Sequence, residues 1–243
     1  MGGLLLLLFG ALAIGALAPG DSGDDDLTRT QGTDGDDTIL GSDGDDVVYS
    51  GDGDDLVYGM DGDDYVRGGA GDDAIIDDQD DATESASGND TFYGGAGDDF
   101  IAVNDGFDVL LGGTGGDYLV SVDDFGTETP DTLSGGYGND YLLGHDGDVM
   151  DGGEGYDAFG VEYFGDDETP VEILDYETGE VIEVFNYDPT LLLNDGSDVV
   201  EVVDLGDYAS VQANGVELVR VLGNAGAYIT VDLYDYSGDA ATA

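Results

Sequence analysis

Residues 41–67 read GSDGDDVVY, SGDGDDLVY and GMDGDDYVR when this part of the chain is divided into blocks of nine. Each block has a pair of aspartates in its middle and ends in two or three larger, mostly apolar residues. Like charges repel, so a chain that repeats carboxylates at one spacing needs something that holds them together. The role of these carboxylates therefore decides both the fold and the function.

The nine-residue period continues through thirteen copies within residues 32–160. Two irregular stretches, 77–84 and 121–125, interrupt it. We number the nine positions of a copy as columns one to nine. Column six is Asp in every copy, column eight is always apolar, and column four is Gly in every copy except the one that carries Thr129. Such regularity indicates a stacked repeat architecture.

Each copy is expected to form half of one coil. Glycines at columns one and four favour a tight turn, and the three residues that end the copy have strand character. The alternation of a strand points column eight inward and columns seven and nine outward. Two copies make one coil, and stacked coils give two parallel sheets around a thin core. Because short strands bury little and glycine-rich turns lose much entropy on ordering, the turns need further stabilisation.

Column six supplies that stabilisation if a cation binds there. Coils stack about 4.7–4.9 Å apart, so the carboxylates of copies n and n+2 face one gap together with main-chain carbonyls. Oxygen ligands at about 2.3–2.6 Å suit Ca²⁺, whereas Mg²⁺ demands a tighter octahedral site. The chain has no Cys and one His, which disfavours thiolate and zinc sites. The sequence therefore predicts several calcium ions, with Asp46 paired to Asp64, and Asp55 paired to both Asp37 and Asp73.

The predicted calcium ligands fall into three groups. The column-six carboxylates are Asp37, Asp46, Asp55, Asp64, Asp73, Asp90, Asp99, Asp108, Asp117, Asp140 and Asp157. Two more, Asp131 and Asp148, are expected to border weaker sites, because GTETPDTLS contains Pro130 and GHDGDVMD lacks one turn residue. The main-chain carbonyl donors are those of Gly32, Asp34, Asp36, Gly41, Asp43, Asp45, Asp52, Asp54, Gly59, Asp61 and Asp63.

Other polar residues of the turns are expected to face solvent. The side chains of columns three and five are interpreted as a solvated acidic surface, and His145 as an exposed turn residue. No catalytic residue and no residue that binds another cofactor is predicted.

The copies GGAGDDAII, GGAGDDFIA and GGYGNDYLL resemble the GGxGxDxUx nonapeptide of the RTX, or haemolysin-type, calcium-binding repeat family. The resemblance covers residues 32–160. It implies an all-β fold, a right-handed parallel β-roll with calcium ions between successive turns. It also implies an extracellular or cell-surface protein that a bacterium secretes.

The overall charge agrees with a fold that needs cations. The net charge is −55, from 58 acidic and 3 basic residues, which opposes compaction and argues against nucleic acid as a partner. Yet 40% of the residues are hydrophobic, including 15 Tyr and 8 Phe, which a disordered acidic tail usually lacks. An EF-hand is disfavoured, because its loop needs Gly at position six, Glu at position twelve and flanking helices.

The parts outside the repeat are divided as follows. Residues 1–20 form a hydrophobic segment and 21–31 a linker, while 161–243 have strand-like runs that predict a small β-rich C-terminal cap and a possible export region. The N-terminal segment resembles a secretory signal, although no Lys or Arg precedes its apolar run. A retained segment and an ordinary apolar element therefore stay open. Contact with a membrane is expected only through residues 4–18.

The sequence indicates a binding protein and not an enzyme. It contains no HExxH, GxSxG, Cys nucleophile or P-loop, and about thirty residues precede the repeat. We interpret it as a secreted calcium-binding module that is structural or that interacts with a partner. Tyr and Val at columns seven and nine predict self-association or a surface or matrix partner. A passive export and folding module is the alternative, and hydrolase activity in the C-terminal region is less favoured.

Overall fold

The computed structural model describes residues 27–77, 88–122, 129–163, 169–186, 200–213, 215–222 and 229–235. All the regular secondary structure in these ranges is β-strand. The described residues include no helix long and apolar enough to span a membrane. The signal-like segment 1–20 and the chain end from residue 236 onward lie outside them.

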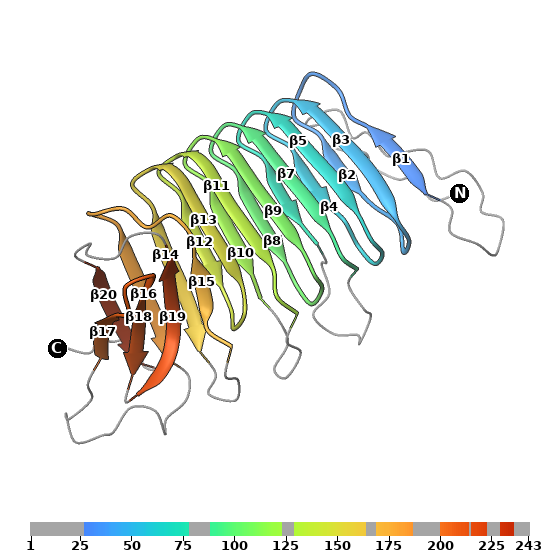
Figure 1. Ribbon diagram of the computed structural model, residues 1–243. Coiled ribbons are helices and arrows are strands. Elements are labelled where there is room, and N and C mark those ends of the chain that lie inside the picture. The colour runs from blue at the N-terminus through green and yellow to red at the C-terminus, as the bar shows by residue number, and fades with distance from the viewer. Residues whose placement is uncertain are drawn as a thin grey trace, which may run out of the picture.

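The strands form two sheets that lie on each other as two layers (Figure 1). In spatial order, sheet A consists of β1 Thr28–Gln31, β3 Asp46–Asp52, β5 Tyr65–Ala70, β7 Thr91–Ala96, β9 Val109–Thr114, β11 Thr132–Gly138, β13 Val149–Gly155, β15 Val171–Ile173, β19 Val216–Leu222, β18 Tyr208–Ala213 and β17 Val200–Asp204. Sheet B consists of β2 Thr38–Leu40, β4 Leu56–Tyr58, β6 Ala74–Ile76, β8 Phe100–Val103, β10 Tyr118–Ser121, β12 Tyr141–Gly144, β14 Ala158–Tyr163, β16 Val181–Asn186 and β20 Thr230–Asp235.

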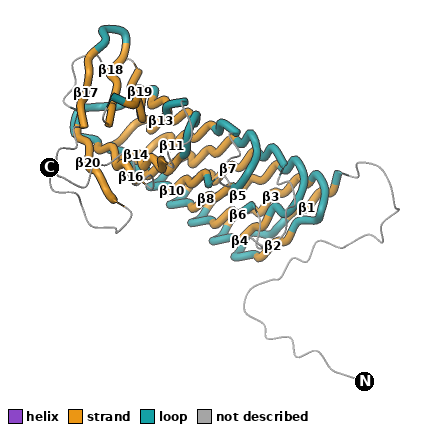
Figure 2. The backbone as a smooth tube through the Cα atoms, turned by 90° about the horizontal axis from the view of Figure 1, so that it is seen from below, coloured by secondary structure: helices purple, strands orange, loops and turns teal. Residues whose placement is uncertain are grey.

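The chain alternates between the two sheets once per copy, so that each strand pairs in parallel with the strand two copies later. Val57 of β4 lies beside Ile75 of β6, and Val48 of β3 lies beside Val66 of β5. The pairing keeps its register across the first irregular stretch. Val66 of β5 and Phe92 of β7 lie side by side, and both are column-eight residues. Figure 2 shows the resulting stack, with turns following one another along its edges. The all-β parallel β-roll is confirmed.

The core between the sheets is one row of column-eight side chains from each sheet. Every one of these residues has an exposed fraction of 1% or less: Ile39, Val48, Val57, Val66, Ile75, Phe92, Ile101, Leu110, Leu119, Leu133, Leu142, Met150 and Phe159. The inward direction of column eight is therefore confirmed. Burial of a large aliphatic or aromatic side chain stabilises a fold by about 1.5–3 kcal/mol, so this row contributes in every copy.

The described residues after Gly160 extend both sheets of the roll. β15 pairs in parallel with β13, and β16 pairs in parallel with β14. β19 and β20 then add one more parallel strand to each sheet, and β18 and β17 follow β19 as antiparallel strands. Sheet A thus changes to antiparallel pairing at its C-terminal end, beyond the repeat.

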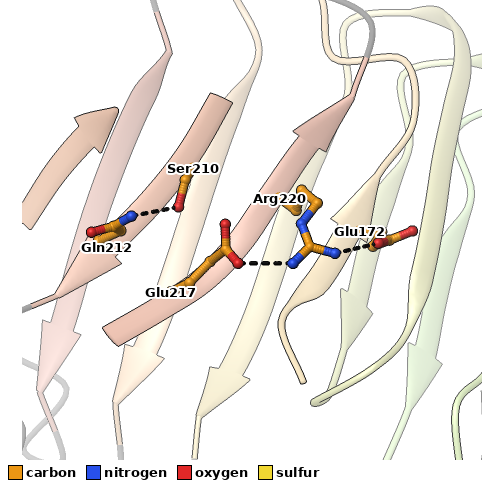
Figure 3. A network of polar contacts seen from close by, with 5 residues as sticks. All are labelled: Glu172, Ser210, Gln212, Glu217 and Arg220. Carbon is orange, nitrogen blue, oxygen red and sulfur yellow. Dashed lines mark hydrogen bonds and ion pairs between the residues drawn. The ribbon is translucent and has the colours of Figure 1, made fainter. Parts of the chain in front are cut away.

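One arginine joins this antiparallel part to the roll (Figure 3). The guanidinium of Arg220 on β19 donates to Glu172 of β15 at 2.7 Å and to Glu217 of its own strand at 2.8 Å. It also lies over the ring of Tyr208 on β18, 5.2 Å from the centroid. The side chain of Arg220 is 29% exposed, so these contacts are partly shielded from solvent.

Candidate metal centre

The column-six aspartates lie where each turn meets the following strand, and all of them are buried. Their exposed fractions are 3% or less, although every one carries an ionisable carboxyl group. An unpaired charge without solvent is costly, so each of these groups requires a partner. The partners of the two carboxylate oxygens differ.

The first oxygen, Oδ1, accepts a hydrogen bond from the preceding coil. The main-chain N–H of a column-six Asp donates to Oδ1 of the column-six Asp two copies later, at 2.7–2.9 Å. Asp46 thus contacts Asp64, and Asp55 contacts both Asp37 and Asp73. These are the pairs that the spacing predicts, brought together through the main chain of one partner and the side chain of the other.

The second oxygen, Oδ2, is buried and has no hydrogen-bond partner in most of these residues. They are Asp55, Asp64, Asp73, Asp90, Asp99, Asp117, Asp140 and Asp157. The Oδ2 atom faces the column-one residue of its own copy, as Gly59 illustrates. A side-chain carbon built on Gly59 would lie 2.7 Å from Oδ2 of Asp64. Glycine at this position keeps the space beside Oδ2 open.

Burial of these carboxyl groups raises their pKa values. The pKa rises to about 8 for Asp64, about 9 for Asp90 and about 7 for Asp99, chiefly because burial disfavours the charged form. Hydrogen bonds from the main chain lower these pKa values in part, and neighbouring carboxylates raise them further. A divalent cation beside Oδ2 would favour the ionised form of several carboxyl groups at once.

The donor set fits a calcium ion. Each gap between successive coils offers carboxylate oxygens from two column-six residues beside turns rich in main-chain carbonyls, and Ca²⁺ binds such hard oxygen ligands. In the part of the chain that the structure describes, no three His, Cys, Asp or Glu side chains gather closely enough to hold a metal. An ion here therefore needs main-chain oxygens to complete its coordination.

The predicted carbonyl donors lie in four turns, within residues 32–36, 41–45, 52–54 and 59–63. One of them is already engaged, because the carbonyl of Asp45 accepts the N–H of Thr28 at 3.1 Å. The assignment of these carbonyls and of the column-six carboxylates as ligands stays a prediction.

Four column-six residues differ in that Oδ2 already accepts a hydrogen bond. In Asp37 and Asp46 the donors are the main chain and hydroxyl of the column-two residue, Thr33 or Ser42. In Asp131 the donor is the hydroxyl of Ser121 at 2.6 Å, and in Asp148 it is the N–H of His145 at 2.8 Å. Asp131 and Asp148 are the two positions where weaker sites are predicted, and these bonds give a physical reason for that prediction.

Column five forms a second ladder that the sequence analysis missed. The side chains of Asp36, Asp45, Asp54, Asp63, Asp72 and Asp98 accept the N–H of the column-five residue two copies later, at 2.7–3.1 Å. These side chains are exposed, but they also hold successive turns together. The signal was present in the sequence, because Asn89 and Asn139 keep the same acceptor atom in this column.

The turn of the eight-residue copy is more buried than expected. His145 has an exposed fraction of 6% and Asp146 one of 3%, so the expectation of an exposed histidine and a solvated aspartate is wrong here. Loss of one residue tightens this turn, since the N–H of Asp148 donates to the carbonyl of His145. A side-chain carbon at Gly147 would lie 3.2 Å from Pro130, a residue of the neighbouring turn. That neighbour closes over the shortened turn.

Comparison with known proteins agrees with this geometry. The family model of the RTX calcium-binding nonapeptide repeat matches residues 20–57, 31–66, 50–81, 85–119 and 125–158, which together exceed half of the chain. No curated protein matches the chain significantly. The matched residues contain every column-six aspartate described above. The protein belongs to the RTX calcium-binding nonapeptide repeat family.

Proposed function

We propose that residues 32–160 form a β-roll that folds when calcium ions fill the gaps between successive turns, and that residues 161–243 cap it. The observation that carries this proposal is the row of buried Oδ2 atoms without hydrogen-bond partners. Without cations these carboxyl groups repel one another inside the fold. With cations the same groups become ligands that join one coil to the next.

The free energy of calcium binding would then contribute to the free energy of folding, because the sites exist only in the folded chain. Each site filled at a calcium concentration 100 times its dissociation constant contributes about 2.7 kcal/mol. Because each coil contacts only its neighbours, several sites in series make folding cooperative. Members of the family are typically secreted by bacteria, and calcium is scarce in the cytosol. The chain would therefore stay unfolded before export and fold outside the cell.

Circular dichroism of the full chain tests the proposal. The β signal should be weak in EDTA and should rise steeply when calcium is added. Asp55→Ala should shift the calcium midpoint upward, because Asp55 contacts both Asp37 and Asp73. Glu154→Ala is the control, because its carboxylate is exposed and is not among the predicted ligands. An unchanged β signal in EDTA would overturn the proposal.

A second candidate role is interaction through the outer faces of the roll. The outward residues of sheet B from β2 to β12 carry no charge, although the chain has a net charge of −55. Phe100, Tyr118 and Tyr141 stack there as an aromatic row, with ring centroids 5.7 and 4.8 Å apart. We propose that this face binds a second copy of the chain once calcium has neutralised the acidic turns. The RTX repeat itself is a structural calcium-binding unit and not a catalytic one.

A further inference from the structure

Asp77 occupies a column-one position that the sequence does not assign to any copy. Its N–H donates to the carbonyl of Ala102, and its own carbonyl accepts the N–H of Met60. Gly59, one coil earlier, donates its N–H to Ile76 in the same way. Asp77 thus follows Gly59 in the stack and is the first residue of the irregular stretch 77–84.

The Cβ position of a column-one glycine lies beside the carboxylate of column six in its own copy. Carbons built on Gly41, Gly59 and Gly144 would lie 2.7–2.9 Å from Oδ2 of the column-six Asp that follows each of them. Ser121 shows the arrangement with a real side chain. It holds a column-one place as the first residue of the second irregular stretch, and its hydroxyl donates to Oδ2 of Asp131 at 2.6 Å. Asp77 stands in the same relation to Asp90 as Ser121 does to Asp131.

Asp77 places a carboxylate where Ser121 places a hydroxyl. The side chain of Asp77 is fully buried, and Asp90 has an exposed fraction of 1%. Oδ2 of Asp90 has no hydrogen-bond partner. Burial raises the pKa of Asp90 to about 9, and Asp77 is the foremost of the neighbouring charges that raise it further. Two carboxylates therefore meet beside an unpartnered oxygen, out of contact with solvent.

We propose that Asp77 is an additional calcium ligand, which forms with Asp90 the tightest calcium site of the roll. This inference rests on the proposed function, since it assumes that calcium binds the column-six row. Ca²⁺ affinity rises with the number of charged ligands, and Asp77 adds a second carboxylate to the one that Asp90 supplies. The site lies in the middle of the repeat, so the first ion bound there can order coils on both sides.

Calcium titration of the full chain by isothermal calorimetry tests the inference. Two variants are compared with the parent: Asp77→Asn, which keeps the shape of the side chain, and Asp77→Gly, which introduces the residue typical of column one. Both should lose the tightest binding phase, with its affinity reduced roughly tenfold or more. Glu154→Gln removes one charge from an exposed side chain that is not among the predicted ligands, and it should leave that phase unchanged.

The outcomes separate this inference from the proposed function. If the parent chain does not fold with calcium, the proposed function fails. If the parent folds and both variants keep the tightest phase at full affinity, only the role of Asp77 is refuted. Variants that are more stable in EDTA but bind calcium as the parent does would show that Asp77 and Asp90 merely share a proton. That result also overturns the inference.

Discussion

At the residue scale, the two carboxylate oxygens of a column-six aspartate have different surroundings. Oδ1 accepts an N–H from the coil before, while Oδ2 stays in a buried space beside column one. In the copy of Asp64, a side-chain carbon at Gly59 would lie 2.7 Å from Oδ2, so the glycine keeps that space open. Where the chain itself supplies a donor, as Ser121 does to Asp131, the second oxygen is satisfied without a cation.

Met60 is the sole non-glycine residue with a positive φ in the described ranges, at 76°. It occupies column two, where Gly69 and Gly95 also have positive φ. A side chain in this region costs of order 1 kcal/mol or more, partly offset by the greater freedom of glycine in the unfolded chain. Met60→Gly should therefore raise the free energy of unfolding in calcium by about 0.5–1 kcal/mol.

Denaturant unfolding in saturating calcium measures this difference. Met60→Ala is the control, because its Cβ keeps the strain of the parent residue and removes only the outer part of the side chain. A loss of stability in Met60→Gly as large as that in Met60→Ala would show that the positive φ carries no strain.

At the element scale, the three-residue strands present two different faces. Their middle residues fill the core, while their outer residues form rows along the stack, as Phe100, Tyr118 and Tyr141 do on sheet B. The hydroxyl of Tyr141 also donates to the carboxylate of Glu183 on β16. Acidic groups are thus concentrated at the turns, and the aromatic row lies on the flat face between them.

Sedimentation tests the proposal that this flat face binds a second copy. In calcium, the mass of the full chain should increase with concentration, and Tyr118→Asp should reduce that increase by placing a charge in the middle of the aromatic row. Tyr156→Asp is the control, because Tyr156 is 72% exposed and lies in a turn outside the row. A parent chain that stays monomeric at every concentration would remove this candidate role.

At the scale of the whole molecule, stability should depend on pH in opposite ways with and without calcium. The raised pKa values mean that the calcium-free fold holds protons that the unfolded chain releases. This stabilisation is fully present below the unfolded value of 3.8 and is lost as the pH rises through about 6 for Asp73 and about 9 for Asp90. In EDTA, the β signal should therefore increase on acidification.

With calcium present, acidification should have the reverse effect on binding. Protons compete with the cation for the same carboxylates, so the calcium midpoint should move to higher concentration as the pH falls. Circular dichroism across this pH range, in EDTA and in calcium, measures both effects. A β signal in EDTA that falls on acidification would contradict the assignment of the raised pKa values to the folded state.

The sequence by itself determined the repeat, the inward column, the alternation of copies between two sheets and the family. These features are periodic, and a strict period allows few ways of stacking. The tertiary structure alone decided how Oδ1 and Oδ2 differ, that column five forms a second ladder, and that Asp77 and His145 are buried. It also showed that the strands after Gly160 extend the roll. These features depend on contacts between separate coils or across an irregular stretch. The repeat pattern does not contain such contacts, because they form only when the coils stack.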